Sequence, residues 1–398
     1  MKTVGIVCEY NPFHQGHRWQ IAEAKRLSGA DTVICAMSGN FTQRGEAAVL
    51  EKGIRTRAAL EGGAELVAEI PVIYAMSGAQ SFARAGIRIL LSAGVDAVSC
   101  GSECCDPEKL KRVAGLLREE PAAYKVALTA GLEQGLRFAA ARQSAVSKAL
   151  GPDAEVLRNP NDILAVEYLI ALQEYGADIP LYLVPRTAAH DTAAESAKEI
   201  RKALTEGQFP ETLESPDIVR EALRDGYGMP DPDFFTTLLY ANAERTLSGT
   251  VPEDGEGLLN RVLKSMAAYH PFAELLQANV TKRYPAARVR RLLMNLALGI
   301  TEEERKACEW SKGPAYLRIL GAGSDEVLAA VGRRSSLPLV VRSSDLEGLS
   351  EAAVRTFEAE ARTTDLYLLS LPGHKLFSHG YEYTRKIEKR EIRKINVN

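Results

Sequence analysis

Short apolar runs, separated by segments with helical spacing, fill the first half of the chain. The runs predict strands at residues 4–8, 32–37, 65–71, 95–103 and 179–184. The segments between them are long enough to hold crossover helices. Strands that alternate with helices of this length form right-handed βαβ units and a parallel sheet. The pattern therefore predicts an α/β fold with a Rossmann-like parallel sheet.

The second half of the chain has a different pattern. Strand signals fade beyond Leu204, and a linker-like region contains Pro210, Pro216, Pro230 and Pro232. Helical spacing then dominates at residues 234–241, 258–269, 272–277 and 288–298. One apolar run at 337–341 predicts a short strand, and its proline favours a sheet edge or a strand start. We therefore expect an α/β domain at residues 1–205, with a helical insertion at 107–150, followed by a mainly α-helical domain at 206–398.

Length and charge narrow the class of protein. A chain of 398 residues suits two to three domains. The net charge of −3 gives no general attraction to nucleic acid, so RNA binding would need local basic patches. No apolar run approaches the roughly 20 residues of a membrane span, and Met1 leads into a strand without a signal-peptide core. We expect a cytoplasmic protein with no membrane partner.

The six cysteines do not predict a metal centre. Cys8, Cys35 and Cys100 lie in or at the end of apolar runs, where a cysteine is usually a small core residue. Cys104 and Cys105 follow closely, but the group has no paired Cys-x2-Cys and no nearby histidine. Zinc is therefore disfavoured, and we expect no metal held by protein side chains.

The first predicted strand leads through a polar loop to a His-x-Gly-His tetrad, where a helix begins. A helix start offers free backbone N–H groups and a partial positive charge. Gly16 lets the backbone come close to a ligand, and His14 and His17 can donate hydrogen bonds to phosphate oxygens in a transition state. The tetrad thus predicts a triphosphate site at the carboxyl edge of the sheet. In the alternative interpretation, the histidines only cap the helix.

Other basic residues are weaker candidates for phosphate binding. Lys52, Arg55 and Arg57 lie on a helix predicted at 51–61, and a solvated helix face is the favoured role for most of them. Ser196 stands at a helix start with Arg201 about a turn later, an arrangement that suits a phosphate clamp. Helix capping explains Ser196 equally well.

Two basic stretches in the second half contain aromatic residues. Residues 281–291 carry Lys282, Arg283, Arg288, Arg290 and Arg291 around Tyr284, without an acidic residue. Residues 385–394 are also rich in lysine and arginine and follow two tyrosines. Basic side chains beside aromatic rings fit an RNA backbone with splayed bases. A solvated helix face fits them equally well.

Several motifs together resemble one known family, the bacterial tRNA(Met) cytidine acetate ligases, from end to end. They are Glu9-Tyr10-Asn11-Pro12-Phe13-His14-x-Gly16-His17, Ser38-Gly39-Asn40-Phe41-x-Gln43-Arg44-Gly45-Glu46, Gly101-Ser102-Glu103, the run from Pro160 to Tyr168, Lys282-Arg283-Tyr284 and Tyr383-Thr384-Arg385-Lys386. The resemblance implies an ATP-dependent ligase with a nucleotidyltransferase-like fold. Such an enzyme activates acetate as acetyl-adenylate and acetylates N4 of the wobble cytidine in elongator tRNA(Met).

The resemblance also implies which residues bind each substrate. His14 and His17 would be catalytic. ATP would be bound by Val7, Cys8, Glu9, Tyr10, Asn11, Pro12, Phe13, His14, Gln15, Gly16, His17, Arg18, Trp19, Gln20, Gly101, Asn161, Arg186 and Arg201. Lys282, Arg283, Arg290 and Arg291 are the expected tRNA contacts, and ATP is expected to bring Mg²⁺. The segment 196–201 departs from the small hydroxyl residues usual in related enzymes, because it contains Lys198 and Glu199.

The expected chemistry needs no general base for activation, because acetate is already a carboxylate at neutral pH. It needs charge stabilisation on the phosphates and a site that protects the reactive adenylate from water. Two rival functions remain. One is an adenylyltransferase acting on a small phosphorylated metabolite, and the other is a non-catalytic RNA-binding protein that senses ATP.

Overall fold

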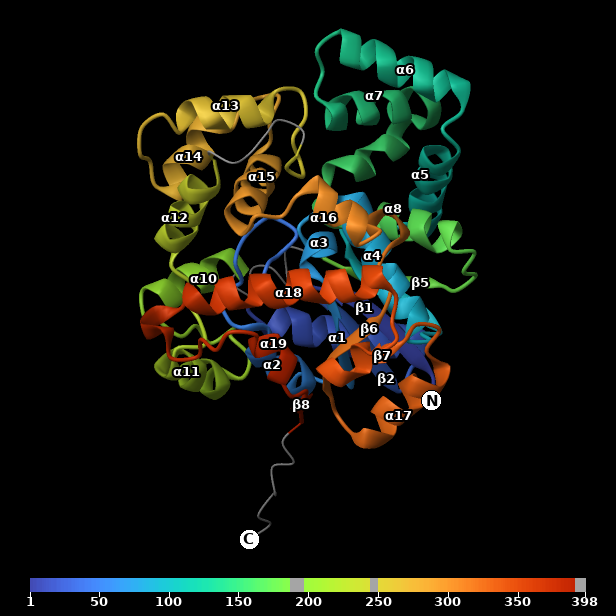
Figure 1. Ribbon diagram of the computed structural model, residues 1–398. Coiled ribbons are helices and arrows are strands. Elements are labelled where there is room, and N and C mark those ends of the chain that lie inside the picture. The colour runs from blue at the N-terminus through green and yellow to red at the C-terminus, as the bar shows by residue number, and fades with distance from the viewer. Residues whose placement is uncertain (187–196, 244–249, 391–398) are drawn as a thin grey trace.

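The computed structural model describes residues 1–186, 197–243 and 250–390. A central sheet is covered by helices on both sides, and further helices extend from it (Figure 1). The first half contributes the elements β1 Thr3–Cys8, α1 Gln15–Ser28, β2 Thr32–Ser38, α2 Lys52–Glu61, β3 Leu66–Ile70, α3 Val72–Ala75, α4 Ala79–Ser92, β4 Ala97–Ser102, α5 Pro107–Glu119, α6 Ala122–Glu133, α7 Phe138–Leu150, α8 Pro160–Glu174 and β5 Leu181–Pro185.

The strand order of the sheet is β5-β4-β1-β2-β3, followed by strands from the second half of the chain. The pairs β1–β2, β1–β4, β2–β3 and β4–β5 are all parallel. The prediction of a parallel α/β sheet with five strands in the first half is therefore confirmed. Parallel strands end at one edge of the sheet, so the loops after β1, β2, β4 and β5 lie at the same edge.

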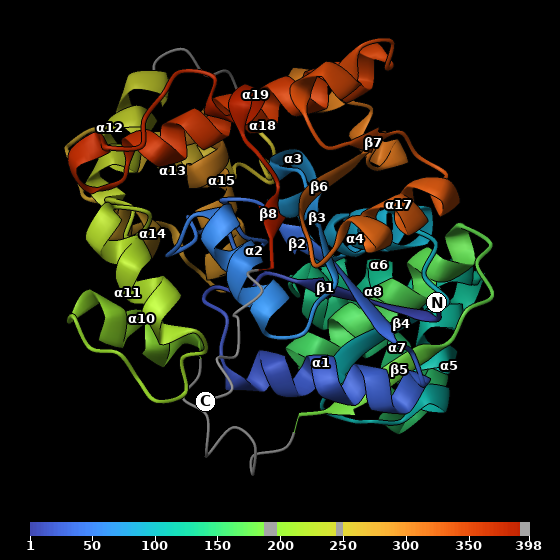
Figure 2. The same ribbon diagram turned by 90° about the horizontal axis from the view of Figure 1, so that it is seen from below.

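The two faces of the sheet bury different helices. Ile21 of α1 and Ala59 of α2 pack with Ile6 and Val33 on one face. On the other face, α4 lies directly against β1, because a Cβ at Gly5 would come within 2.8 Å of Leu90. Figure 2 shows α1 on the near side of the strands, with α4 and α8 beyond them. The sheet is thus the middle layer of three.

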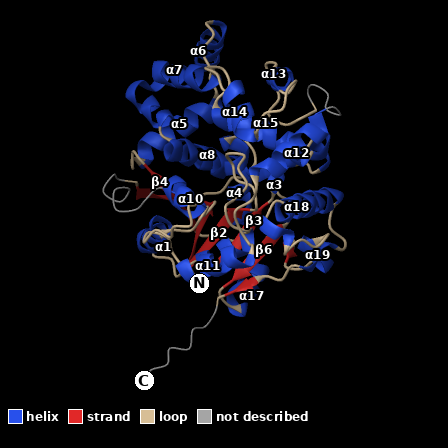
Figure 3. Ribbon diagram, turned by 90° about the vertical axis from the view of Figure 1, so that its left-hand side faces the viewer, coloured by secondary structure: helices blue, strands red, loops and turns tan. Residues whose placement is uncertain are grey.

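The second half contributes most of the remaining helices. Its elements are α10 Ala197–Thr205, α11 Pro216–Asp225, α12 Pro232–Ala243, α13 Leu258–Ser265, α14 Phe272–Asn279, α15 Ala286–Leu298, α16 Glu302–Ala307, β6 Leu317–Ala322, α17 Asp325–Arg334, β7 Leu339–Val340, α18 Glu351–Leu369, α19 Tyr381–Thr384 and β8 Glu388–Lys389. Helices α12 to α15 form a group beside the helical insertion α5 to α7 (Figures 1 and 3). The predicted helical insertion is confirmed.

The second half also extends the sheet, which the sequence pattern did not predict. β6 is fully buried and pairs antiparallel with β3, so that Leu66 faces Ala322. β7 and β8 both pair with β6, and β7 falls within the strand predicted at 337–341. The expected boundary near residue 205 therefore does not separate the sheet from the later residues.

The proline-rich region after Leu204 is not simply a linker. Pro216 and Pro232 each stand in the first turn of a helix, α11 and α12. Proline suits that position, because its fixed φ is helical and its missing N–H would have no partner there. The same residues that suggested a linker in fact begin two helices.

Candidate nucleotide-binding site

The loop after β1 brings His14 and His17 to the start of α1. His14 is the N-cap residue of the helix, and its Nδ1 accepts a hydrogen bond from the backbone N–H of Gly16 at 3.1 Å. The imidazole rings of His14 and His17 stack, with centroids 3.8 Å apart. His14 therefore caps the helix and also faces the second histidine, so the two interpretations of the tetrad are compatible.

Two of the N–H groups that were expected to be free at this helix start are occupied. The N–H of Gly16 is bonded to His14, and the N–H of Gln15 donates to the carbonyl of Thr212 at 2.9 Å. The segment around Thr212 crosses the helix start, and Leu213 forms a β-bridge with His14. The expectation of free N–H groups is wrong for these two positions, and the N–H groups of His17 and Arg18 both donate to the carbonyl of His14, at 2.8 and 3.2 Å.

His17 has the properties of a neutral hydrogen-bond donor. Its Nδ1 is buried and has no hydrogen-bond partner among the described residues. Burial, together with the neighbouring His14 and Arg186, lowers the pKa of His17 well below its ordinary value. The ring is therefore uncharged at neutral pH, with one of its two nitrogens protonated.

Below the histidines, Tyr10 and Phe13 form a buried floor. Their rings meet edge to face with centroids 4.9 Å apart, and the Tyr10 ring lies 4.8 Å from the ring of His17. Tyr10 has a positive φ of 47°, which turns the chain sharply at the end of β1. Val7 and Cys8 belong to β1 itself, and the side chain of Cys8 is buried. These residues shape the loop more than they present polar atoms to a ligand.

Gly101, Asn161 and Arg186, which are widely separated in the sequence, lie together beside the histidines. Arg186 donates to the side-chain oxygen of Asn161 at 3.5 Å. A Cβ at Gly101 would come within 3.0 Å of the Arg186 side chain and 3.9 Å of the Asn161 oxygen. The structure thus gathers these three predicted ATP contacts at the carboxyl ends of β4 and β5, next to His17.

Two acidic residues, Glu103 and Asp162, fix this corner of the site, and the sequence pattern did not predict the contacts that they make. Glu103 accepts a hydrogen bond from the Asn161 side chain at 2.6 Å and another from the N–H of Asp162 at 3.0 Å. Asp162 is fully buried and accepts from Ser102 Oγ at 2.5 Å and from the N–H of Cys104 at 3.1 Å. The start of α8 and the end of β4 therefore hold each other. The motifs Gly101-Ser102-Glu103 and Pro160-Asn161-Asp162 were the signal.

Arg201 of α10 contacts the loop between β1 and α1. It donates to the carbonyl of Asn11 at 2.8 Å and lies 3.7 Å from a carboxylate oxygen of Glu46. Ser196, the other member of the predicted phosphate clamp, lies outside the described residues. Arg18, by contrast, pairs with Glu214 at 3.0 Å and has a mainly exposed side chain. Trp19 and Gln20, the last residues of the predicted loop segment, follow it within α1.

The loop after β2 brings the second half of the chain to this site. Gln43 donates its backbone N–H to the Glu9 carboxylate at 2.7 Å. Glu46 pairs with Arg290 of α15 at 2.7 Å. Gly45 makes this approach possible, because a Cβ there would lie 2.7 Å from the backbone nitrogen of Arg291.

The four predicted tRNA contacts fall into two pairs. Lys282 and Arg283 are exposed on the surface just before α15. Arg290 and Arg291 point inward: Arg290 pairs with Glu46, whereas Arg291 is buried and pairs with Glu253 at 2.9 Å. The first pair is thus the more exposed of the two, although Arg283 lies 3.4 Å from a carboxylate oxygen of Glu256.

The described residues offer no cluster of three or more His, Cys, Asp or Glu side chains for a metal ion. Within the same residues, no helix is long and apolar enough to cross a membrane. Mg²⁺ typically keeps several waters and binds through substrate phosphates. Mg²⁺ that accompanies a nucleotide would therefore need few ligands from the protein itself.

Comparison with known proteins identifies the family of the chain. A sequence model described as HIGH Nucleotidyl Transferase matches residues 1–379. The tRNA(Met) cytidine acetate ligase of Acetivibrio thermocellus is 35% identical over 97% of this chain and 99% of that protein. The enzyme of the same name from a Thermoanaerobacter species is 35% identical over 93% of this chain and 96% of that protein.

A solved structure is similar over nearly the whole chain. Thermotoga maritima TmcAL, crystallised with alpha-thio ATP, superposes with a TM-score of 0.89 at 28% identity and covers 98% of this chain and 100% of its own. Both the sequence and the fold are therefore shared over their full length. The chain belongs to the tRNA(Met) cytidine acetate ligase family of HIGH nucleotidyl transferases.

Proposed function

We propose that this protein activates acetate with ATP and acetylates N4 of the wobble cytidine in elongator tRNA(Met). The observation that carries this proposal is the convergence of His14, His17, Asn161 and Arg186 at one edge of the sheet. The relatives are named for acetate and for a cytidine of tRNA(Met), which supports acetate as the acyl donor and that cytidine as the acceptor. The alpha-thio ATP bound to the Thermotoga maritima protein supports ATP as the nucleotide.

In the first step, a carboxylate oxygen of acetate attacks the α-phosphorus of ATP, and the bond to pyrophosphate breaks. The pentacovalent transition state gathers negative charge on the phosphate oxygens. His14 and neutral His17 donate hydrogen bonds to these oxygens, and the Arg186 guanidinium adds positive charge. Mg²⁺ bound to the ATP phosphates would supply further positive charge there.

In the second step, the exocyclic amine of cytidine attacks the acetyl carbonyl, and AMP leaves. The amine loses a proton as the amide forms, and the proton passes to the phosphate of the departing AMP or to water. Lys282 and Arg283, the exposed basic pair before α15, are the candidate contacts for the tRNA backbone. A tRNA substrate of this kind supports a cytoplasmic location for the enzyme.

The experiment is mass spectrometry of tRNA after incubation with the protein, ATP and isotopically labelled acetate. The expected product is a labelled N4-acetylcytidine at the wobble position, with AMP and pyrophosphate released in equal amounts. Transfer of AMP to a phosphorylated metabolite, with unmodified tRNA, would instead establish the adenylyltransferase alternative. Bound tRNA without any turnover of ATP would establish the non-catalytic alternative.

A further inference from the structure

Helix α2 carries two basic side chains that the sequence pattern placed on a solvated face. Lys52 and Arg55 are both fully buried, with 0% of each residue exposed. Burying a charge is costly unless it is well paired or hydrogen-bonded. That expectation for the helix face is therefore wrong at these two positions.

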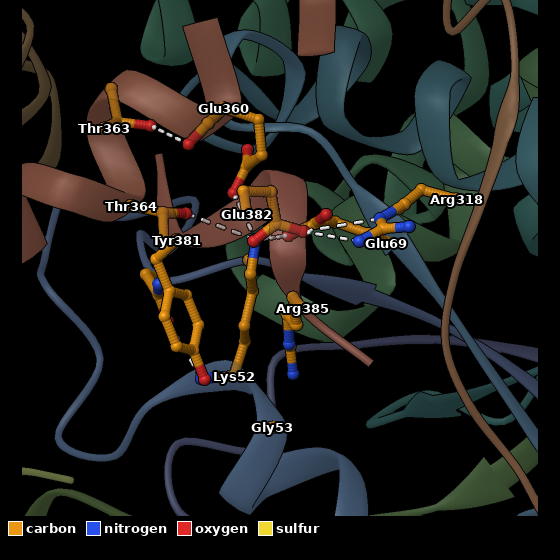
Figure 4. A network of polar contacts seen from close by, with 12 residues as sticks. Lys52, Gly53, Glu69, Arg318, Glu360, Thr363, Thr364, Tyr381, Glu382 and Arg385 are labelled. Carbon is orange, nitrogen blue, oxygen red and sulfur yellow. Dashed lines mark hydrogen bonds and ion pairs between the residues drawn. The ribbon is translucent and has the colours of Figure 1, made fainter. Parts of the chain in front are cut away.

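Lys52 anchors α2 to the second half of the chain. Its Nζ lies 2.7 Å from Glu69, 3.0 Å from Glu360 and 2.9 Å from Glu382. These carboxylates come from β3, α18 and α19, and Figure 4 shows them converging on the lysine. Residues from three distant segments thus fix the first turn of α2.

Arg55, one turn later, faces the edge of the sheet at which the loop between β1 and α1 begins. Its Nη1 donates to the carbonyls of Glu9 at 2.6 Å and Ser38 at 3.2 Å. Nη2 donates to the carbonyl of Gly39, and Nε donates to that of Leu50 at 3.0 Å. Ser38 is the last residue of β2, and Glu9 is the first residue after β1.

The guanidinium therefore joins the carboxyl ends of two neighbouring parallel strands. Its planar set of N–H donors reaches four carbonyls at once, which the single ammonium of a lysine cannot do in the same geometry. The carbonyl of Glu9 immediately precedes Tyr10, where the chain turns with a positive φ toward His14.

Gly39 connects the two buried basic groups. Its carbonyl accepts from Arg55, and a Cβ at this position would lie 2.6 Å from Glu69 and 2.7 Å from Glu360. Gly39 therefore contacts carboxylates that pair with Lys52, and its carbonyl accepts from Arg55. A displacement of α2 would disturb both sets of contacts and the loop that follows β1.

We propose that Arg55 is a positioning residue for nucleotide activation. Its guanidinium fixes the carbonyls at which β1 and β2 end, and this sets the path of the loop that carries His14 and His17. Arg55 acts through the loop backbone and touches no reacting atom. This proposal rests on the proposed function for its acetate-dependent readout, whereas its ATP-binding readout is independent of acetate.

The test compares Arg55→Lys with a matched control, Arg305→Lys. Arg305 is also a buried arginine, but it donates to the carbonyl of Met76 and pairs with Glu302, and neither contact involves α2 or the loop after β1. Both variants should lose thermal stability. At a temperature at which each variant is fully folded, ATP affinity is measured by calorimetry without acetate, and kcat and KM by acetate-dependent pyrophosphate exchange.

Arg55→Lys should lower kcat/KM for ATP by about 10²-fold, since a misplacement of about 1 Å at a reacting centre costs that much. Arg305→Lys should keep wild-type ATP affinity and kcat/KM. If Arg55→Lys does not fold, Arg55→Gln, which leaves no buried unpaired charge, takes its place with the same expectation.

Wild-type ATP binding and exchange in the folded Arg55 variant would overturn the proposal, and so would equal losses in the Arg55 and Arg305 variants. If the wild-type protein shows no acetate-dependent exchange, the proposed function fails. The positioning role then still stands or falls on the ATP affinity of the Arg55 variant.

Discussion

The rings of His14 and His17 stack at a centroid distance of 3.8 Å with 29° between their planes. At this distance the two imidazoles cannot both carry a positive charge without strong repulsion. Burial is the main cause of the low pKa of His17, and His14 and Arg186 lower that pKa further. His17 is therefore uncharged at neutral pH, and Arg186 supplies the permanent positive charge beside it.

Removing either ring should slow activation without unfolding the protein. We expect His14→Asn and His17→Ala each to reduce acetate-dependent pyrophosphate exchange by about 10²- to 10³-fold, the cost of losing one transition-state donor. Asparagine at position 14 preserves an N-cap, so its effect reports on the imidazole and not on the helix end. Exchange near the wild-type rate in either variant would remove that residue from the catalytic role.

The low pKa of His17 should appear as a pH dependence of stability. In the unfolded chain His17 has an ordinary pKa near 6.5, so below about pH 6.5 the unfolded state binds a proton that the folded state does not. Stability is therefore lost as the pH falls below 6.5, by at most about 1.4 kcal/mol per pH unit from this group. Urea unfolding between pH 7.5 and 5 should show a shallower decline for His17→Gln than for wild type. Parallel curves would mean that His17 has no lowered pKa.

Arg186 should contribute to ATP binding. Arg186→Ala removes a cation beside His17, and we expect roughly 10- to 100-fold weaker ATP binding when this charged group is removed. Arg186→Lys should recover only part of this affinity if the arginine binds through two guanidinium nitrogens. Arg26→Ala, which alters an arginine paired with Glu23 at the far end of α1, is the matched control for calorimetry. An unchanged affinity in Arg186→Ala would place this arginine outside the site.

The two basic pairs near α15 should behave differently toward tRNA. Replacing Lys282 and Arg283 with glutamine should weaken tRNA binding and lower the log–log salt slope by about 0.7 to 0.9 for each phosphate that is no longer neutralised. Replacing Arg290 and Arg291 should leave that slope unchanged, because both are engaged with Glu46 and Glu253. Binding measured across a salt series distinguishes the pairs. Equal slopes for wild type and the Lys282/Arg283 variant would show that this stretch is only a solvated surface.

Lys52, which anchors α2 through three buried carboxylates, should contribute strongly to the stability of the protein. Although burial raises the pKa of a carboxyl group, Lys52, Arg385 and Arg318 lower the pKa of Glu382 to about 2. Lys52→Met leaves buried carboxylates without their central cation, and we expect a loss of about 3 to 5 kcal/mol in the free energy of unfolding. Lys111→Met, at an exposed pair, should cost less than about 1 kcal/mol. A small loss at Lys52, measured by urea unfolding, would contradict the anchoring role.

Local patterns predicted those parts of the fold that local chemistry determines. The five parallel strands of the first half are apolar runs between helical segments, and His14 stands where a polar loop meets a helix. The burial of Lys52 and Arg55 could not be predicted from helix spacing, because their partners include Glu360 and carbonyls of other strands. β6 was missed because a short apolar run among helices carries no sign that its partner is β3.

The same contrast between local patterns and distant contacts applies to the candidate site. Gly101, Asn161 and Arg186 were assigned through motif resemblance, and the structure brings them together. The inward direction of Arg290 and Arg291 was not predictable, because basic residues at helical spacing ordinarily indicate a solvated face. Their partners, Glu46 and Glu253, lie in loops far away in the sequence.

The antiparallel pairing of β3 with β6 also governs the order in which the protein can be assembled during synthesis. β3 ends at Ile70, whereas β6 begins only at Leu317. A ribosome must therefore produce most of the chain before the edge of β3 receives its neighbour. Until then, the nascent protein presents an open row of backbone donors and acceptors, the kind of edge at which strands of separate molecules join.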